Sequence, residues 1–383
     1  MHVIDTTNSA AALPKGVHLL INSGLLEKTR AGPCLVAPGP VVTRLKRPWE
    51  RVVFSKVRDA NPFFHVVEAI WMLAGRDDAE TLNHYVTDFG QRFAESASGS
   101  ANWEAGGQIH GAYGHRWRFR FGLDQLGAVV DRLIKDPGTR QCVIQMWDCS
   151  SVTLPVSLGN GNVGEQEVGA LDLTGEWKDR PCNTHIYLRV RGDGPDHWPD
   201  GVVISKGNRV LDMTVCCRSN DIVWGLYGAN SVHFSFLQEY LAARVGVAMG
   251  DLYVLSNNFH MYETMLGVMT KRMAKEESSI VGALHDDRYF SLRLKTRPVF
   301  TVGEKADEDV IEFMSWHDEC YRTESDVPLR HCENDWFCEV AQPVVRSHRL
   351  WRDGQKIRAV AAANEIQSED WRVACTEWMT RRM

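Results

Sequence analysis

The chain has 383 residues and a formal net charge of −6, with 44% hydrophobic and 24% charged residues. This composition is typical of a globular protein with a substantial core, in one large domain or two smaller ones. The negative charge argues against a polymeric nucleic acid as partner, so any arginine cluster is expected to serve a local anion. No signal-peptide pattern or apolar run of membrane-spanning length is present, which predicts neither secretion nor membrane insertion.

Ten cysteines are scattered along the chain, and the only adjacent pair is Cys216-Cys217. This distribution favours reduced thiols in the cytoplasm over a disulfide framework. His331-Cys332 and Cys338 lack the paired spacing of a metal site, so we interpret them as structural and predict no metal.

Residues 1–60 contain short apolar runs broken by proline and glycine, which predict an irregular N-terminal segment with one or two strands. Asn61-Pro62 then opens a predicted helix, because proline is favoured in the first turn. Apolar residues recur through it at helical spacing, at Phe64, Val67, Ile70 and Trp71. Glu68 lies among them, and the pattern leaves open whether its carboxylate is exposed on the outer face or buried.

Ser96 to Gly107 is rich in Ser, Gly and Ala and predicts a loop. In the following stretch, Ile109 to Trp117, glycines alternate with aromatic and basic residues. It is either an aromatic-rich turn or a pocket wall in which glycine lets a ligand approach the backbone. A helix is predicted from Asp124 to the stop at Asp136-Pro137-Gly138, followed by Thr139-Arg140 and a strand over 141–147.

Gly159 to Gly164 matches the GxGxxG pattern of dinucleotide-binding proteins letter for letter. No helix pattern follows it, because residues 165–178 are polar and are broken by Gly169 and Gly175. The strand–turn–helix context of such a site is therefore missing, and we interpret the segment as a flexible insertion.

Arg180-Pro181-Cys182-Asn183 leads directly into an alternating segment, 184–190, which predicts a strand with two different faces. Cys182 therefore lies at the mouth of a strand. A thiol beside arginines can have a lowered pKa and act as a nucleophile, although a free cysteine is more often a small buried apolar residue. The motif alone leaves both interpretations open.

Two further strands, Val210 to Cys217 and Asp251 to Leu255, are predicted on either side of a helix from Ser231 to Val245. Arginine suits a phosphate bidentately, and an amide can read the donor and acceptor edge of a base. The polar residues that favour a mononucleotide pocket are Arg218, Ser219, Asp221, Asn230, His260 and Tyr262. Beyond about Glu263 the chain is predicted to be helical, with no motif.

In chain order, these motifs resemble those of thymidylate synthases and pyrimidine nucleotide hydroxymethylases. They are Glu68 in an apolar helix, Tyr113-Gly114, Asp136-Pro137-Gly138-Thr139-Arg140, Pro181-Cys182, Arg218-Ser219-x-Asp221, Asn230 and His260-x-Tyr262. The resemblance implies an α/β (α+β) fold with a thymidylate synthase-like mixed sheet, flanking helices and a homodimer across the sheet. It covers residues 28–265, which leaves an N-terminal extension, 1–27, and a C-terminal helical extension, 266–383, packed on or continuing the catalytic domain.

The resemblance also implies the substrates, a dUMP-like nucleotide and 5,10-methylenetetrahydrofolate. Cys182 would add to C6 of the pyrimidine, which makes C5 a carbon nucleophile. Glu68 would act through water near O4 and help to activate the folate, and Tyr113 would assist proton removal at C5. Asn183 and Asp221 complete the expected catalytic group.

The remaining roles are binding roles. Arg218, Ser219 and, more loosely, Arg30 would hold the phosphate, and Arg140 would be lent by the partner subunit. Asn230 would read the base, and His260 and Tyr262 would hold the sugar. Asp221 would hold the pterin, and Asn61 stands where the family often has a folate-side histidine.

Several departures favour hydroxymethylation. Asn183-Thr184 follows Cys182 where synthases usually have histidine, as in hydroxymethylases of large phages. The turn before Asn230 has one more residue than the synthase pattern, and Trp224 to Phe236 resembles the dUMP hydroxymethylases of phages that replace thymine. The segment Asp88 to Phe93 lacks the tryptophans that shield the reacting carbon in synthases.

We therefore expect a cytoplasmic, phage-type dUMP C5-hydroxymethyltransferase that uses methylenetetrahydrofolate. The alternatives are thymidylate synthase and then a dCMP hydroxymethylase. A catalytically silent nucleotide-binding relative is a rival from another class, which the intact Cys182 disfavours.

Overall fold

The structure is a computed structural model that describes residues 1–29, 31–93, 107–150, 152–157, 163–168, 171–174, 179–192, 209–275, 277–302, 305–323, 329 and 334–383. Arg30, the loop after Ser96, most of the glycine-rich stretch 159–164 and His331-Cys332 were singled out from the sequence and lie outside the described residues.

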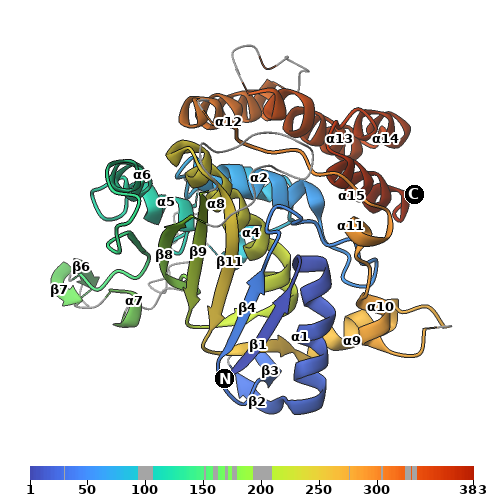
Figure 1. The fold of residues 1–383 in the computed structure, drawn as a ribbon, viewed down its shortest axis with the longest axis horizontal. Helices are drawn as coiled ribbons and strands as arrows, with labels where there is room; N and C mark the ends of the chain where they lie inside the picture. The colour runs from blue at the N-terminus through green and yellow to red at the C-terminus, as the bar shows by residue number, and fades with distance from the viewer. Residues whose placement is uncertain are drawn as a thin grey trace.

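A six-stranded mixed sheet forms the centre of the molecule, in the order β1-β4-β11-β9-β8-β5 (Figure 1). Its strands are β1 (His2–Thr6), β4 (Val41–Leu45), β5 (Val143–Gln145), β8 (Asn183–Arg191), β9 (Val210–Cys217) and β11 (Ala248–Ser256). The pairs β1–β4 and β9–β11 are parallel, and the other neighbours are antiparallel. The predicted mixed α/β fold is confirmed.

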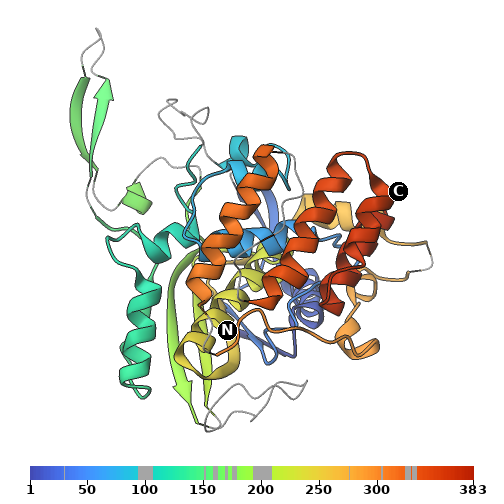
Figure 2. The ribbon, with the colours of Figure 1, turned by 90° about the horizontal axis from the view of Figure 1, so that it is seen from above.

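A smaller four-stranded sheet has the order β10-β12-β3-β2. Its strands are β2 (Leu25–Thr29), β3 (Gly32–Val36), β10 (Asn220–Asp221) and β12 (Phe259–Tyr262). A third pair, β6 (Val152–Ser157) and β7 (Val163–Val168), forms an antiparallel hairpin that projects from the body (Figure 2).

Two buried helices pack against each other beside the central sheet, and the second of them contacts its strands. Asn61 caps the first, α2 (Pro62–Leu73), and its Oδ1 accepts a hydrogen bond from Phe64 N at 3.2 Å. The second, α8 (Ser231–Val245), has the predicted bounds and ends at Gly246, whose positive φ of 81° suits glycine. Glu68 on α2 is only 7% exposed, so its carboxylate is buried.

The C-terminal helices lie over α2 (Figure 1), where α12, α13 and α15 contact it. The helices after α8 are α9 (Glu263–Arg272), α10 (Ile280–Leu284), α11 (Arg288–Ser291), α12 (Ala306–Thr323), η3 (Phe337–Ala341), α13 (Gln342–Arg352), α14 (Lys356–Ala363) and α15 (Glu369–Thr380). Because α2 is covered on the side away from the sheet as well, polar residues on it lose contact with water.

Shorter helices and the N-terminal segment complete the fold. They are α1 (Ser9–Ser23), α3 (Glu80–Asn83), α4 (Phe89–Phe93), α5 (Tyr113–Arg118), α6 (Gln125–Lys135), α7 (Leu171–Thr174) and the π-helix η2 (Ile222–Asn230). Residues 1–27 contribute β1 to the central sheet and Leu13, Val17 and Leu20 to the core. The division at residues 27 and 265 stays a prediction.

Within the described part of the chain, no helix combines the length and apolar character needed to cross a bilayer. The same residues contain no group of three or more His, Cys, Asp or Glu side chains placed to hold a metal ion.

Candidate active site

The sheet topology brings Cys182, Arg218, Asp221 and His260 to one end of the strands. Because β8 runs antiparallel to β9, the start of β8 lies beside the end of β9, with Asn183 opposite Cys217. Arg218 N accordingly donates to Cys182 O at 2.9 Å. The parallel strand β11 ends at the same edge and leads into β12, where His260 pairs with Asp221 of β10.

Cys182 is half-buried and lies against Tyr113, the first residue of α5. The Tyr113 hydroxyl accepts a hydrogen bond at 3.3 Å from the backbone N–H of Asn183, the residue after Cys182. Burial raises the pKa of this thiol above its usual value, which outweighs the opposing effect of Arg218. The lowered thiol pKa that the motif left open is therefore not found in this structure.

The position of the Arg218 guanidinium explains why its charge does not lower the pKa of the Cys182 thiol below the usual value. Its Nε donates to Pro181 O at 3.1 Å and its Nη2 to Arg180 O at 3.2 Å. Its Cζ lies 5.8 Å from the centroid of the Trp147 ring, whose Nε1 also donates to Pro181 O. The side chain is thus held beside Cys182 but remains exposed, and Ser219 next to it is half-buried. An exposed guanidinium and a hydroxyl at adjacent positions suit an anionic group.

Asp221 and His260 have unused polar atoms that are buried. Asp221 Oδ1 accepts from Val223 N at 2.7 Å and Trp224 N at 2.6 Å, while Oδ2 has no hydrogen-bond partner among the described residues. Burial raises the pKa of Asp221, and the Trp224 N–H bond and the charge of His260 oppose the rise. In the described part of the chain His260 Nδ1 is also without a partner, and the His260 ring is perpendicular to that of Tyr262 at 5.3 Å. Buried orphan atoms of this kind fit a heterocyclic ligand with N–H and hydroxyl groups.

The turn before Asn230 is formed by η2, whose backbone kinks at Gly228 because the φ and ψ of that residue depart from helical geometry. A Cβ at Gly228 would lie 2.8 Å from the main-chain oxygen of Val223 and 2.7 Å from Nη2 of Arg58, so any larger residue would force the backbone to shift. Asn230 is half-buried at the start of α8, and its Nδ2 lies 3.4 Å from Asn220 Oδ1.

Glu68 lies opposite a residue that the sequence had not suggested. Its Oε2 is 2.8 Å from Nε2 of His233 on α8, an ion-pair distance without the alignment of a hydrogen bond. Phe234, the next residue on α8, stacks on Tyr113 with 6.1 Å between ring centroids. The contact of α2 with α8 therefore links Glu68 to the wall that carries Tyr113.

Three other predicted residues have their polar atoms partly engaged. The Asn183 amide donates through Nδ2 to Cys216 O at 2.9 Å, whereas its buried Oδ1 has no partner in the described residues. The Thr184 hydroxyl donates to Cys216 O at 3.0 Å, so its proton is not available to a water. Asn61 uses Oδ1 for the cap of α2 and Nδ2 for Tyr85 O at 3.1 Å, and its contact with folate stays a prediction.

Arg140 is exposed on the turn between α6 and β5. Leu188 N donates to the main-chain oxygen of Cys142, two residues after Arg140. This bond places Arg140 near the end of β8 that is away from Cys182. Leu188 is six residues beyond Cys182, so Arg140 lies about 20 Å or more along the strand from its own Cys182. The structure does not bring Arg140 to the Cys182 of the same subunit.

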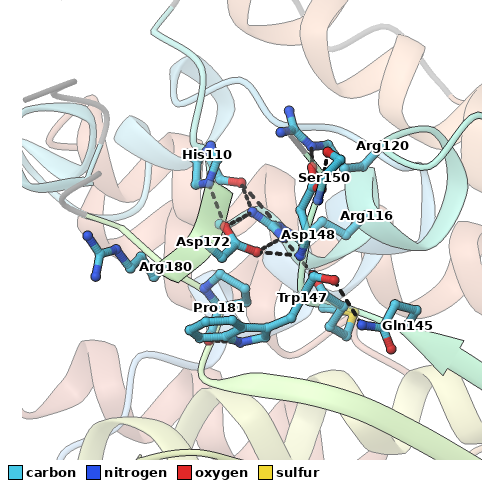
Figure 3. Close-up of polar contacts among 12 residues, drawn as sticks. His110, Arg116, Arg120, Gln145, Trp147, Asp148, Ser150, Asp172, Arg180 and Pro181 are labelled. Atoms are coloured by element: carbon cyan, nitrogen blue, oxygen red, sulfur yellow. Dashed lines mark hydrogen bonds and ion pairs between the residues drawn. The ribbon is translucent and has the colours of Figure 1, made fainter. Parts of the chain in front are cut away.

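A buried ionic network holds the segment that carries Tyr113 (Figure 3). The Arg116 guanidinium binds both carboxylate oxygens of Asp172, at 2.6 and 2.9 Å, and His110 Nε2 is 2.7 Å from Oδ1. Asp148 N donates to Oδ2 of Asp172 at 2.7 Å, and Arg120 Nε donates to the Asp148 carboxylate at 2.8 Å. Burial would raise the pKa of Asp172, but these partners lower it well below its usual range. Residues 109–117 thus form a fixed wall beside Cys182.

Sequence reasoning missed His233, Trp147, Asp172 and Asp179. Asp179 lies between Lys178 and Arg180 in a polar run, and nothing in that pattern marks it as different from its neighbours. His233 and Trp147 lie a few residues from predicted site residues, which is the only signal that could have identified them. Their contacts depend on segments far apart in the sequence.

Comparison with known proteins identifies a matching family model and similar phage proteins. A family model described as "Thymidylate synthase" matches residues 58–289. A protein of Pseudomonas phage M6 called deoxyuridylate hydroxymethyltransferase is 33% identical over 100% of this chain and 95% of the relative. A protein of the same name from Bacillus phage SP01 is 32% identical over 58% of this chain and 49% of the relative. The crystal structure of thymidylate synthase from T4 phage aligns with a TM-score of 0.48 at 19% identity, covering 70% of this chain and 81% of that chain.

Proposed function

This chain belongs to the thymidylate synthase family, and from that premise we propose that it hydroxymethylates C5 of dUMP with a one-carbon unit from 5,10-methylenetetrahydrofolate. The observation that carries the proposal is the full-length similarity to a phage deoxyuridylate hydroxymethyltransferase, combined with an intact Cys182 at the end of β8. The phage origin of that relative also supports action in the cytoplasm of an infected cell.

In this proposal Cys182 is the nucleophile that adds to C6 of the pyrimidine. Its raised pKa means that the thiol needs help to ionise, and Arg218 supplies the nearby positive charge. Tyr113, whose hydroxyl accepts a hydrogen bond from the N–H of Asn183 next to the nucleophile, would assist proton removal at the neighbouring C5. Glu68 in its buried pair with His233 would act through water near O4.

The nucleotide would be held by groups at the neighbouring strand ends and at the start of α8. Arg218 and Ser219 would bind the phosphate, and Asn183 and Asn230 would face the base. His260 and Tyr262 would bind the sugar, and the buried Oδ2 of Asp221 fits the N–H groups of a pterin. Arg30, outside the described residues, stays a looser candidate for the phosphate.

We also propose a homodimer across the central sheet. On the face away from α8, the Tyr187 side chain of β8 and the Val143 side chain of β5 are 47% and 43% exposed, and the two residues pair in register. A second copy on this face would cover them and bring its Arg140 to the phosphate. This arrangement would explain why Arg140 is distant from its own Cys182.

Water, rather than a hydride from the folate, is the proposed second reactant at the new carbon. The α4 segment between Phe89 and Phe93 has no tryptophan to shield that carbon. A tenfold change in the partition between two fates needs only about 1.4 kcal/mol of barrier difference. Easier access of water and a more polar environment beside Cys182 would therefore be sufficient to change the product from a methyl to a hydroxymethyl group.

The proposal is tested by product analysis with dUMP and dCMP in parallel. We expect 5-hydroxymethyl-dUMP from dUMP by mass spectrometry, tritium release from C5 and no dihydrofolate signal. Conversion of dCMP in preference to dUMP would identify a dCMP hydroxymethylase instead. Absence of tritium release would identify a silent nucleotide-binding protein.

Base choice is expected to depend on Asn230. Its amide can pair with both N3–H and O4 of uracil, whereas cytosine presents the reversed pattern. Because an unpaired polar edge costs about 1–3 kcal/mol, Asn230→Asp should shift the dUMP to dCMP ratio of kcat/KM by roughly tenfold to hundredfold towards dCMP. Asn257→Asp is the control and should leave the ratio unchanged. Asn257 is exposed and its backbone N–H donates to Cys217 O at the end of β9. An unchanged ratio in Asn230→Asp would show that Asn230 does not read the base.

A further inference from the structure

Asp179 is a carboxylate in the site to which no role has been given above. It lies three residues before Cys182 and is half-buried. Its Oδ2 accepts a hydrogen bond from Gly111 N at 3.1 Å. A Cβ added to Gly111 would lie 2.5 Å from this oxygen, so the absence of a side chain at Gly111 is what lets the carboxylate rest on the wall that carries Tyr113.

Asp179 lies within electrostatic reach of the proposed reacting groups. Its negative charge raises the pKa of both Cys182 and Tyr113, and the charges of Arg116, Arg218 and Glu68 act on it in turn. Burial raises the pKa of Asp179 to about 6, against the lowering effects of the Gly111 N–H and the two arginines. Among the described residues, no hydrogen bond reaches its other oxygen, Oδ1.

Other groups near Cys182 are less suited to accept a proton from water. The Glu68 carboxylate faces His233 at 2.8 Å, and burial raises the pKa of the Tyr113 hydroxyl well above its usual value. The Thr184 hydroxyl donates to Cys216 O. Asp179 combines an anchored oxygen, a free oxygen and a position beside the nucleophile.

We propose, on the basis of the function above, that Asp179 is the general base that activates the water added to the exocyclic methylene carbon at C5. Asp179 Oδ1 takes a proton from the water while the water oxygen forms a bond to that methylene carbon. The electron pair of the C5–methylene double bond moves into the ring and onto O4. It then returns to form the C5–C6 double bond as the bond from C6 to the Cys182 sulfur breaks and the thiolate leaves. The sum is addition of one water, and no oxidant or reductant is needed.

The test compares Asp179→Asn with the wild type in two readouts during a single turnover with enzyme in excess. Tritium release from C5 precedes the water step, so we expect it to stay within about threefold of wild type, whereas formation of 5-hydroxymethyl-dUMP should fall by about 10²–10⁴-fold, as for loss of a general base. Added 2-mercaptoethanolate, a nucleophile that needs no base, should capture the methylene carbon of the variant as a thioether. Asp131→Asn, an exposed acid on α6, is the matched control and should behave as wild type.

Two further measurements separate a base from a merely structural carboxylate. The rate of the water step in the wild type should rise with pH through about 6 and then level off, and this limb should be absent in Asp179→Asn. Gly111→Ala keeps the carboxylate but displaces it, and should reproduce the selective loss of the hydroxymethyl product.

Hydroxymethyl product formed by Asp179→Asn at the wild-type rate would overturn the inference. An equal loss of tritium release and product would overturn it as well, because that result indicates an earlier role. Failure of the proposed function looks different, since the wild type itself would then yield dTMP.

Discussion

Cys182→Ala is expected to reduce formation of 5-hydroxymethyl-dUMP by roughly 10⁴-fold or more, because the covalent step at C6 cannot occur without the thiolate. Binding of dUMP should stay within a few-fold of wild type. The Arg218 side chain is held by the main-chain oxygens of Arg180 and Pro181, which the substitution leaves in place. The two quantities are measured by mass spectrometry of the product and by calorimetric titration with dUMP.

Cys216→Ala is the matched control, since Cys216 is a half-buried thiol on the neighbouring strand β9. It should retain activity within about threefold, as expected for removal of a small apolar side chain. Turnover by Cys182→Ala near the wild-type rate would exclude Cys182 as the nucleophile.

Two inactive variants are expected to regain enzymatic activity when they are co-expressed with different tags and form heterodimers. Cys182→Ala lacks the nucleophile, and Arg140→Glu places a negative charge where the partner's phosphate would bind. A heterodimer of the two contains one complete site, built from the intact Cys182 of one subunit and the intact Arg140 of the other. Random pairing should return about a quarter of wild-type activity from preparations that are each nearly inactive.

Cys182→Ala with Asp221→Ala is the control pair, because both residues belong to the site of one subunit. No heterodimer of that pair has a complete site, so little activity should return. Equal recovery from the two pairs, or none from either, would contradict the lending of Arg140 across the interface.

Local patterns predicted several of the elements that carry the site, but not α5 or η2. Alternation predicted β8 and β9, and 3.6-residue periodicity predicted α8 with the observed bounds. Since antiparallel neighbours bring their opposite ends together, the adjacency of Cys182 and Arg218 follows from these two strands. The order of motifs then indicated the family, which the comparisons bear out.

Burial and charge balance could not be predicted in the same way. Glu68 is buried where α2 packs against α8, opposite His233, and no local pattern brings these two helices together. The sign of the pKa shift at Cys182 depends on burial and on two carboxylates that compete with Arg218. The contact of Asp179 with Gly111 joins residues 68 positions apart, and no local pattern contains that information.

The most direct test of the central claim is the source of the oxygen in the product. The purified enzyme is supplied with dUMP and methylenetetrahydrofolate in oxygen-18-labelled water, with absorbance followed for dihydrofolate and the nucleotide analysed by mass spectrometry. The account predicts 5-hydroxymethyl-dUMP that carries the label on its new hydroxyl, together with tetrahydrofolate that is not oxidised. Unlabelled dTMP with an equal amount of dihydrofolate would contradict it and make this chain a thymidylate synthase.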